Sequence, residues 1–161
     1  MNVKIFTTGG TIDKIYFDAK NVYQVGEPEV NALLAEANVN FDYSTTSLLR
    51  KDSLEITADD RELIRNAVAS EPTSRILITH GTDTMIETAK CLLGISDKTI
   101  VLTGSMQPAR LRISDAFFNI GYAVAAVQLL APGVYVTMNG KVFDPQISHK
   151  NVAGNRFEDI D

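Results

Sequence analysis

The stretch ILITHGTDTMIETAKCLLG, residues 76–94, predicts a buried strand, a small polar turn and a helix in succession. The apolar run at 76–78 has the length and composition of a strand that is covered on both faces. Thr84 and Glu87 have the spacing of a capping box at the start of a helix, and Gly94 supplies its end. The helix would bury one face, formed by Met85, Ile86, Ala89, Leu92 and Leu93.

The same alternation of strand and helix recurs along the chain. Further strands are predicted at 3–6, 43–49, 100–102 and 134–136, and Asn139-Gly140 predicts a tight hairpin to 142–143. Strands that alternate with helices and are apolar on both faces indicate the α/β class. We therefore expect a doubly wound, mostly parallel sheet with helices on both faces.

Three more helices are expected from apolar periodicity and from their start signals. One follows Pro28, with Val30, Leu33, Leu34 and Ala37 on its buried face. The second opens with a capping box at Thr57 and Asp60, and buries Leu63, Ile64, Ala67 and Val68. The third runs from Ser114-Asp115 to Leu130 and is apolar nearly all round, including Phe117, Phe118, Ile120, Val124 and Val127, which predicts a deeply buried helix.

Bulk properties indicate one soluble domain. The chain has 161 residues, of which 45% are hydrophobic, so we expect a single domain over residues 1–161. A net charge of -5 without a basic stripe argues against a nucleic-acid partner. No apolar run reaches the roughly 20 residues that span a bilayer, so we expect no membrane association and a cytoplasmic location. Cys91, the sole cysteine, is expected to pack in the apolar pattern of its helix.

Four small polar segments follow predicted strands, at the edge where doubly wound sheets bind ligands. They are TTGGT at 7–11, LLRKD at 48–52, THGTDT at 79–84 and TGSMQ at 103–107. Gly9 and Gly10 would let the backbone approach a ligand and present successive N–H groups to an oxyanion, with Thr11 at the rim. No helical or alternating period covers 11–26, so we expect a long functional or disordered loop there, and a polar, partly mobile tail after Val152.

Several chemical readings of these segments compete. Thr82 and Asp83 at a strand-to-helix junction could hold an ammonium group, or they could only cap the helix. His80 is interpreted as a packed, hydrogen-bonded neighbour in preference to a general base. Ser148-His149-Lys150 places a nucleophile beside a base, but adjacent residues on an extended chain point apart. No phosphate loop, dinucleotide fingerprint or metal-ligand spacing is present, so neither a cofactor nor a metal is expected.

TTGGTIDK at 7–14 and ITHGTDTMIETA at 78–89 closely resemble the two signature segments of bacterial-type L-asparaginases. The resemblance continues through LTGSMQP at 102–108, RISDAFFN at 112–119 and MNGKVFDPQISHK at 138–150, so it covers nearly the whole chain. The family's fold agrees with the doubly wound sheet. The chain corresponds to the amino-terminal domain, and the smaller second domain of the usual enzyme has no counterpart in it.

The resemblance implies five catalytic positions. Thr11 corresponds to the threonine that forms the acyl-enzyme, and Tyr23 to the lid tyrosine beside it. Thr82, Asp83 and Lys150 match the family's second triad. A threonine hydroxyl needs a nearby base, which Lys150 could supply through Thr82 or Tyr23, and the sequence leaves open which residue activates Thr11.

The implied function is conversion of L-asparagine to L-aspartate and ammonia, with L-glutamine as a possible second substrate. Asp83 would hold the substrate ammonium, residues 48–52 its carboxylate, and the loop 12–26 would close as a lid. Arg50 and Lys51 depart from the family pattern. Arg50 could grip the carboxylate or block the pocket. The substrate-binding positions are Gly10, Arg50, Lys51, Gly81 and Ser105. A homo-oligomer is expected, and the alternative function is a weak or inactive amino-acid-binding domain.

Overall fold

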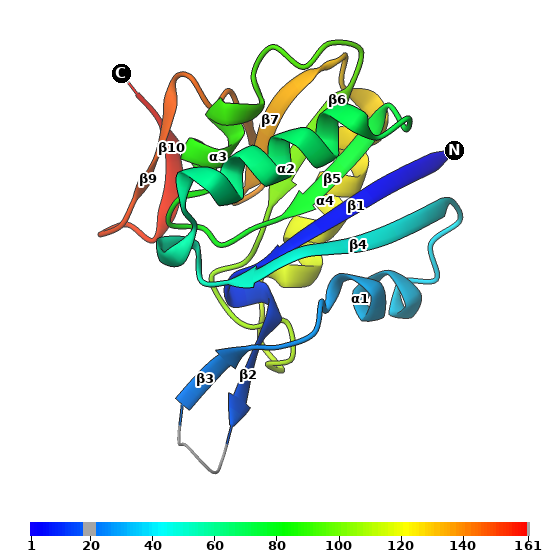
Figure 1. Ribbon diagram of the computed structural model, residues 1–161. Coiled ribbons are helices and arrows are strands. Elements are labelled where there is room, and N and C mark those ends of the chain that lie inside the picture. Colours follow the sequence, from blue (N-terminus) through cyan, green and yellow to red (C-terminus); the bar gives the residue numbers. More distant parts are fainter. Residues whose placement is uncertain (18–21, 161) are drawn as a thin grey trace.

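A six-stranded sheet with helices on both faces forms the centre of the computed structural model, which describes residues 1–17 and 22–160 (Figure 1). The strand order is β4-β1-β5-β6-β7-β8, and every neighbouring pair is parallel except β7 and β8. The strands are β1 (Asn2–Gly9), β4 (Asp42–Lys51), β5 (Arg75–Thr79), β6 (Thr99–Thr103), β7 (Gly133–Met138) and β8 (Lys141–Phe143). The predicted doubly wound, mostly parallel sheet is confirmed.

The order of the strands creates a switch point at β1. The chain leaves β1 for β4 on one side, and then crosses back to β5 on the other side. Connections that depart in opposite directions leave a crevice between them at the carboxyl ends of the strands, which is where open α/β sheets bind ligands. The segments that follow β1 and β5 therefore meet at this edge.

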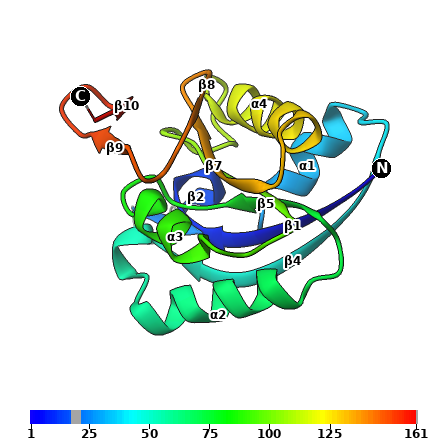
Figure 2. The ribbon, with the colours of Figure 1, turned by 90° about the horizontal axis from the view of Figure 1, so that it is seen from above.

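Two helices cover each face of the sheet (Figure 2). The helices α2 (Ala58–Ser70) and α3 (Met85–Leu92) pack on one face, whereas α1 (Val30–Glu36) and α4 (Ala116–Leu129) pack on the other. Alternate residues of the central strands divide between the two cores, since Ile76 and Ile78 face α2 and α3 while Leu77 faces α4. All four predicted helices are confirmed.

The composition of α4 predicted a deeply buried helix, and this prediction is wrong. Phe117, Phe118 and Leu129 are exposed, and only the side that carries Ile120 and Val127 packs against the sheet. The outer face of α4 is apolar as well, so the sequence shows no period that could distinguish solvent from core.

Two segments in which no regular structure was expected form pairs of strands. The segment after β1 forms a 3-10 turn, η1 (Thr11–Asp13), and an antiparallel hairpin of β2 (Lys14–Phe17) and β3 (Val22–Val25), while residues 18–21 of the predicted loop lie outside the described residues. The tail forms a second antiparallel pair, β9 (Ser148–Asn151) and β10 (Arg156–Asp159). Phe157 fastens this pair because its ring is buried against Phe143.

Local signals had mixed outcomes. The capping box of Thr57 and Asp60 is present, and Asn139-Gly140 turns with positive φ as a tight hairpin does. Thr84 stands at the N-cap of α3 without a side-chain cap, because its hydroxyl donates to the carbonyl of Ser53 at 2.7 Å.

Cys91 is exposed, contrary to the expected packing. Within the described residues, no helix combines the length and the apolar content that crossing a membrane requires.

Candidate active site

Lys150 joins two residues of the β5–α3 loop. Its Nζ donates to the hydroxyl of Thr82 at 2.8 Å and to the carboxylate of Asp83 at 2.6 Å. Thr82 is buried, and the Lys150 side chain is 13% exposed. The Lys150 amine is thus hydrogen-bonded to a hydroxyl and to a carboxylate, although Lys150 and Thr82 are 68 residues apart in the sequence. A hollow of about 290 Å³ opens beside Lys150 and Asp83.

The β9–β10 pair carries Lys150 to this position. Lys150 pairs with Phe157 in the antiparallel ladder, and β9 lies against α3 (Figure 1). The main-chain N–H of Phe157 donates to Asn139 Oδ1, and the hydroxyl of Ser148 donates to the carbonyl of Asp144. The small sheet is therefore fastened on both sides of Lys150, which limits the positions that the amine can occupy.

At the switch point, Gly10 packs main chain against main chain with Gly81, and Gly81 packs against the side chain of Ser53. A Cβ on Gly10 would lie 2.4 Å from the main chain of Gly81, and a Cβ on Gly81 would lie 2.5 Å from Cβ of Ser53. Since real Cβ contacts are never so short, glycine is required at both positions. Thr11 follows Gly10 and Thr82 follows Gly81, so this packing brings together the two loops that carry the threonines.

The expected oxyanion cradle at Gly9 and Gly10 is only partly available. The N–H of Gly10 donates to the carbonyl of Lys51 at 2.9 Å, so this donor is engaged. Both glycines have positive φ, which turns the chain from β1 into η1. The role of Gly10 in the structure is close packing, and the expectation that it offers a free N–H is wrong.

Asp52 is a second carboxylate that interacts electrostatically with Lys150. Its side chain pairs with Lys14 at 2.8 Å. The hydrogen bond from Lys14 is the main cause that lowers the pKa of Asp52, and the charge of Lys150 contributes in the same direction. Asp52 therefore stays ionised and places negative charge near the Lys150 amine.

His80 is packed and neutral, as the sequence indicated. Its Nδ1 lies 2.7 Å from the carbonyl of Gly81, which only accepts, so Nδ1 carries the proton. Nε2 therefore accepts from the hydroxyl of Thr88 at 2.8 Å, and Thr88 in turn accepts from Arg61 Nε. Burial lowers the pKa of His80 to about 4, and the nearby charge of Arg61 acts in the same direction. This chain of hydrogen bonds holds the carbonyl next to Thr82.

The loop after β6 is held by the start of α4. Ser105 is buried and its hydroxyl donates to the carbonyl of Gln107. The carboxylate of Asp115 accepts from the N–H groups of Met106 and Gln107. Asn119 donates to the carbonyl of Gly104 at 3.0 Å, so the RISDAFFN run organises this loop.

Tyr23 lies on the hairpin that projects from the body of the fold (Figure 1). Its side chain is half exposed, and its ring packs edge-on against Tyr16 at 5.5 Å between centroids. At the base of the hairpin, buried Asp13 accepts from the N–H of Glu29 at 2.9 Å. Desolvation raises the pKa of Asp13 to about 7, against the opposing effect of that hydrogen bond.

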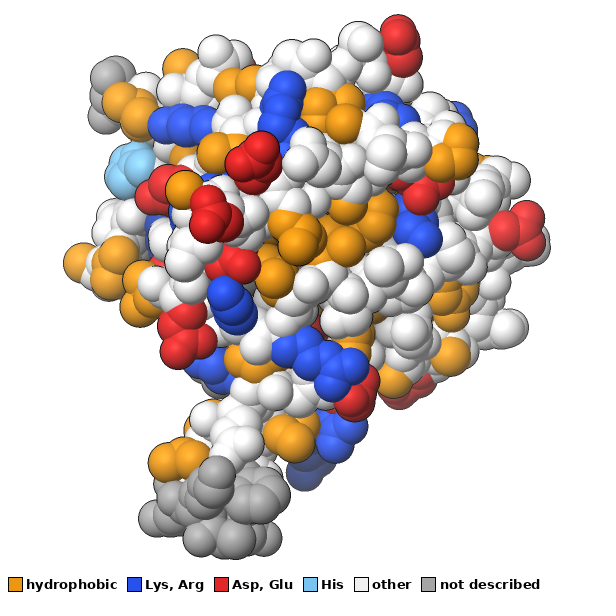
Figure 3. Space-filling view, viewed as in Figure 1, with side chains coloured by type: hydrophobic (Ala, Val, Ile, Leu, Met, Phe, Trp, Pro, Cys, Tyr) orange, Lys and Arg blue, Asp and Glu red, His pale blue; other side chains and the backbone are white. Residues whose placement is uncertain are grey.

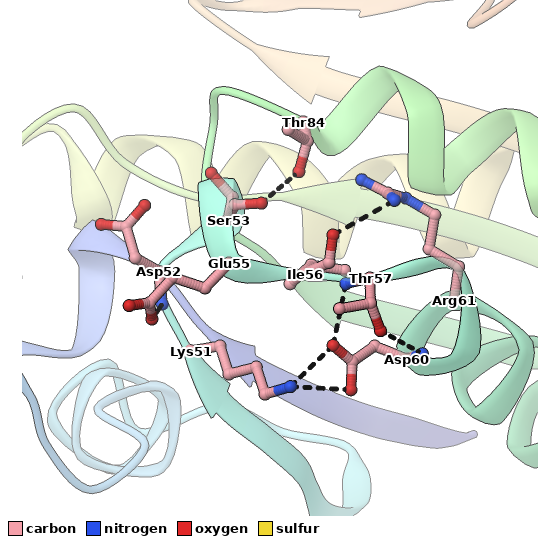
Figure 4. A network of polar contacts seen from close by, with 9 residues as sticks. All are labelled: Lys51, Asp52, Ser53, Glu55, Ile56, Thr57, Asp60, Arg61 and Thr84. Atoms are coloured by element: carbon pink, nitrogen blue, oxygen red, sulfur yellow. Dashed lines mark hydrogen bonds and ion pairs between the residues drawn. The ribbon is translucent and has the colours of Figure 1, made fainter.

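Arg50 and Lys51 are not brought into the group around Lys150. Arg50 pairs with Glu27, and Lys51 donates to both oxygens of Asp60 at 3.0 and 2.8 Å. Figure 4 shows the Lys51 side chain directed to Asp60 at the start of α2, whereas Asp52 and Ser53 lie in the turn beyond it. The segment 48–51 is itself part of β4, so the loop begins later than the sequence indicated.

Three residues at this edge were missed by sequence reasoning. Ser53 is buried in the turn η3 (Ser53–Glu55) and its Cβ faces Gly81. Asp115 was interpreted only as a helix start, although it holds the loop at 106–107. Thr88 links His80 to Arg61. A signal existed for Ser53 alone, because Asp52 and Glu55 have capping-box spacing around it. In residues 1–17 and 22–160 no group of three His, Cys, Asp or Glu residues forms a metal site.

Comparison with known proteins points to a single family. The model of "Asparaginase, N-terminal" matches residues 2–158. The glutaminase-asparaginase of Pseudomonas aeruginosa is 32% identical over 169 residues, which cover 94% of this chain and 46% of that protein. L-asparaginase 2-3 of Saccharomyces cerevisiae is 37% identical over 156 residues, which cover 88% of this chain and 42% of that protein.

Solved structures agree with this result. The thermostable L-asparaginase from Thermococcus kodakarensis superposes with a TM-score of 0.82 at 28% identity, covering 99% of this chain and 51% of that one. L-asparaginase I from Vibrio cholerae gives the same TM-score at 26% identity, covering 98% and 51%. The chain spans about half the length of the relatives it matches. With residues 2–158 matched by the family model and the fold shared, the chain belongs to the asparaginase family and corresponds to its N-terminal domain.

Proposed function

We propose that this protein hydrolyses the side-chain amide of L-asparagine, releasing L-aspartate and ammonia. One observation carries the proposal: Lys150 donates to both Thr82 and Asp83, on the loop whose Gly81 packs against Gly10, the residue before Thr11. Relatives named L-asparaginase and glutaminase-asparaginase support the reaction class, and the latter name makes L-glutamine a second candidate substrate.

The proposed reaction is a double displacement. The Thr11 oxygen attacks the amide carbon, and its proton passes, directly or through Thr82, to Lys150 in its neutral amine form. The carbonyl oxygen becomes an oxyanion, and we assign the main-chain N–H groups of Thr11 and Thr82 as its donors, since the N–H of Gly10 already donates to Lys51. The C–N bond then breaks, the proton moves to the nitrogen, and ammonia leaves. Water attacks the resulting ester and regenerates the Thr11 hydroxyl.

Substrate anchoring is assigned by charge. Asp83 would receive the α-ammonium of the substrate, because its carboxylate is partly exposed beside the crevice. Arg50 would receive the α-carboxylate once it leaves Glu27, while Gly81 and Ser105 shape the wall and Lys51 supports the strand that carries Arg50. The hairpin that bears Tyr23 would close over the substrate. No metal or cofactor takes part in this scheme.

A second candidate is a domain that binds the amino acid without turnover. Its support is the position of Tyr23, which is half exposed and packs on Tyr16 within the projecting hairpin. We further propose that residues 1–161 act as one domain and that the protein is cytoplasmic, a location that also stands in the name of a Campylobacter jejuni neighbour, "probable cytoplasmic L-asparaginase".

The decisive experiment measures ammonia release from L-asparagine and L-glutamine by the wild type and by Thr11→Ala. The proposal expects release by the wild type and a fall of at least about a thousandfold in the variant. Aspartate binding measured by calorimetry serves as the control, since Thr11→Ala should retain it. Binding by the wild type without ammonia release would establish the second candidate instead.

A further inference from the structure

Asp13 fastens the segment that follows the β2–β3 hairpin. Its carbonyl accepts from the N–H of Gly26 at 2.7 Å, and its carboxyl accepts from the N–H of Glu29 at 2.9 Å. Asp13 ends η1 directly before β2, and Gly26 comes directly after β3. One residue therefore joins the chain where it enters the hairpin to the chain where it leaves.

The base of the hairpin is closely packed. Asp13 is only 2% exposed. A Cβ on Gly26 would lie 3.2 Å from the carbonyl oxygen of Asp13, so little space remains between the two ends of the hairpin. The N–H of Ala109 donates to the carbonyl of Ile12 at 3.1 Å, which ties η1 to the loop before α4. Tyr23 lies on the part that projects from the body of the fold, so its position depends on the contacts at the base (Figure 1).

Two ion pairs flank the Asp13 carboxyl. Arg50, at the end of β4, pairs with Glu27 in the fastened segment. Arg110, in the loop before α4, donates to the carboxylate of Glu29 at 2.5 Å. Both guanidinium groups therefore have a carboxylate partner. Among the residues that the structure describes, an ionised Asp13 would have no cation of its own.

A third ion pair lies at the same junction. Lys14, the first residue of β2, lies 2.8 Å from the carboxylate of Asp52. Figure 3 shows Lys, Arg, Asp and Glu side chains lying together where the hairpin meets the body of the protein. The cations around the base are thus engaged, and Asp13 is the least exposed acidic group among them. Burying a carboxylate without a partner is costly, so this site favours the neutral carboxyl.

We propose that Asp13 is a positioning residue for Tyr23: its neutral carboxyl holds the base of the hairpin, and loss of its proton releases the segment 26–29. Burial raises the pKa of Asp13 to about 7, against the hydrogen bond from Glu29 N–H, while the Glu29 carboxylate raises it further and Arg50 lowers it. When the base opens, water reaches the carboxyl and its pKa returns toward 3.8.

The direction of the pH effect follows from these two values. The open form loses its proton at a lower pH than the closed form, so the closed form is favoured most below about pH 4. Opening becomes easier as the pH rises from there, and the effect levels off above about pH 7, where both forms are ionised. The hairpin is therefore held most firmly in acid and least firmly in alkali.

The consequence for catalysis rests on the proposed function, in which the hairpin closes Tyr23 over the substrate. A hairpin whose base has opened holds Tyr23 in that place for a smaller fraction of the time. The apparent affinity for substrate falls by that fraction. The release of the hairpin itself depends on no reaction, so it can be measured in the free protein.

Hydrogen exchange of the Val22–Val25 amides, followed by mass spectrometry from pH 5 to 8, tests the release. Protection factors, corrected for the intrinsic exchange rate, should fall in the wild type by up to about tenfold per pH unit below pH 7. Asp13→Asn removes the charge but retains an acceptor for Glu29, and should lose most of this slope. Asp42→Asn, a matched change of an exposed carboxylate, should retain it. Wild-type protection that is independent of pH, or an equal slope in Asp13→Asn, would overturn the proposal.

Steady-state ammonia release from L-asparagine tests the effect on Tyr23. The ratio of the wild-type KM to that of Asp13→Asn should increase on the order of tenfold from pH 5 to 8, and the ratio cancels titrations that both proteins share. A constant ratio in two active enzymes would reject Asp13 as a positioning residue. If neither protein releases ammonia while the exchange slope is present, the proposed function fails and the hold of Asp13 on the hairpin stands.

Discussion

Gly10 and Gly81 pack main chain against main chain, so closely that a Cβ on Gly10 would lie 2.4 Å from Cα of Gly81. Each of these glycines precedes a threonine that we assign to the reaction. The two loops belong to β1 and β5, the strands at the switch point of the sheet. The distance between Thr11 and Thr82 therefore depends on two residues that lack a side chain.

Gly10→Ala should separate these loops. The variant incurs the strain of an alanine at φ 88 and ψ -175, a region that is essentially restricted to glycine and costs about 1–3 kcal/mol, together with a main-chain clash. Gly94→Ala is the control for a positive φ without a clash, because Gly94 has a φ of +83 and nothing lies within 4 Å of the added Cβ. Urea unfolding should show that Gly10→Ala loses roughly twice as much stability as Gly94→Ala. Equal losses would show that the loops can move apart freely.

Lys150→Met should lower kcat by at least about a hundredfold with a smaller change in KM, since the amine takes part in proton transfer and its aliphatic stem is replaced. Lys141→Met, which removes an exposed lysine paired with Asp159, is the control and should be neutral. Steady-state ammonia release gives both constants. An unchanged kcat in Lys150→Met would remove the lysine from the mechanism.

Arg50 and Glu27 form an ion pair, and substitutions of the two residues should change KM in opposite directions. Arg50→Ala should raise KM for asparagine by about tenfold, because a charge-assisted bond to the carboxylate is lost. Glu27→Gln should lower KM, because the guanidinium is released from its partner. The two variants are compared in the same ammonia assay. If Arg50→Ala improves KM, the arginine obstructs the pocket.

His80 makes the fold sensitive to acid. Its pKa is about 4 in the folded protein against 6.5 when unperturbed, so the unfolded chain binds the extra proton between these values. The stabilisation is complete well above pH 6.5 and decreases by about 3 kcal/mol as the pH falls to 4. His80→Gln should lack this part of the slope in urea titrations at several pH values, whereas exposed His149→Gln should retain it. Parallel slopes for all three proteins would contradict the assignment.

Asp13 makes the stability depend on pH in the direction opposite to His80. Its pKa is about 7 in the folded protein against 3.8 when unperturbed, so the folded state holds a proton that the unfolded chain has lost between these values. Stability therefore decreases as the pH rises through this window, with Glu29 opposing ionisation and Arg50 favouring it. Asp13→Asn keeps the acceptor for the Glu29 N–H and should be more stable than wild type at pH 8 by about 4 kcal/mol. Exposed Asp42→Asn should not reproduce this gain.

The strands and helices of the central layers follow from local pattern. The segment 76–94 contains the apolar run, the turn and the helical face of β5 and α3, and each is decided by residues within a few positions of one another. The same holds for the capping box at Thr57 and for the hairpin at Asn139-Gly140. Periodicity was uninformative for α4, because an apolar outer face and an apolar inner face give the same pattern.

The sequence by itself determined the α/β class and the four helices, because short-range periodicity carries that information, and its family resemblance supplied the side chains that we propose as reactive. Only the tertiary structure decided that Lys150 reaches Thr82 and Asp83, that Arg50 faces Glu27, and that the tail is a fastened pair of strands. These contacts join residues far apart in the chain, and they depend on how the loops pack at the switch point. Main-chain approach at Gly10 and Gly81 is a property of that packing, which no local pattern contains.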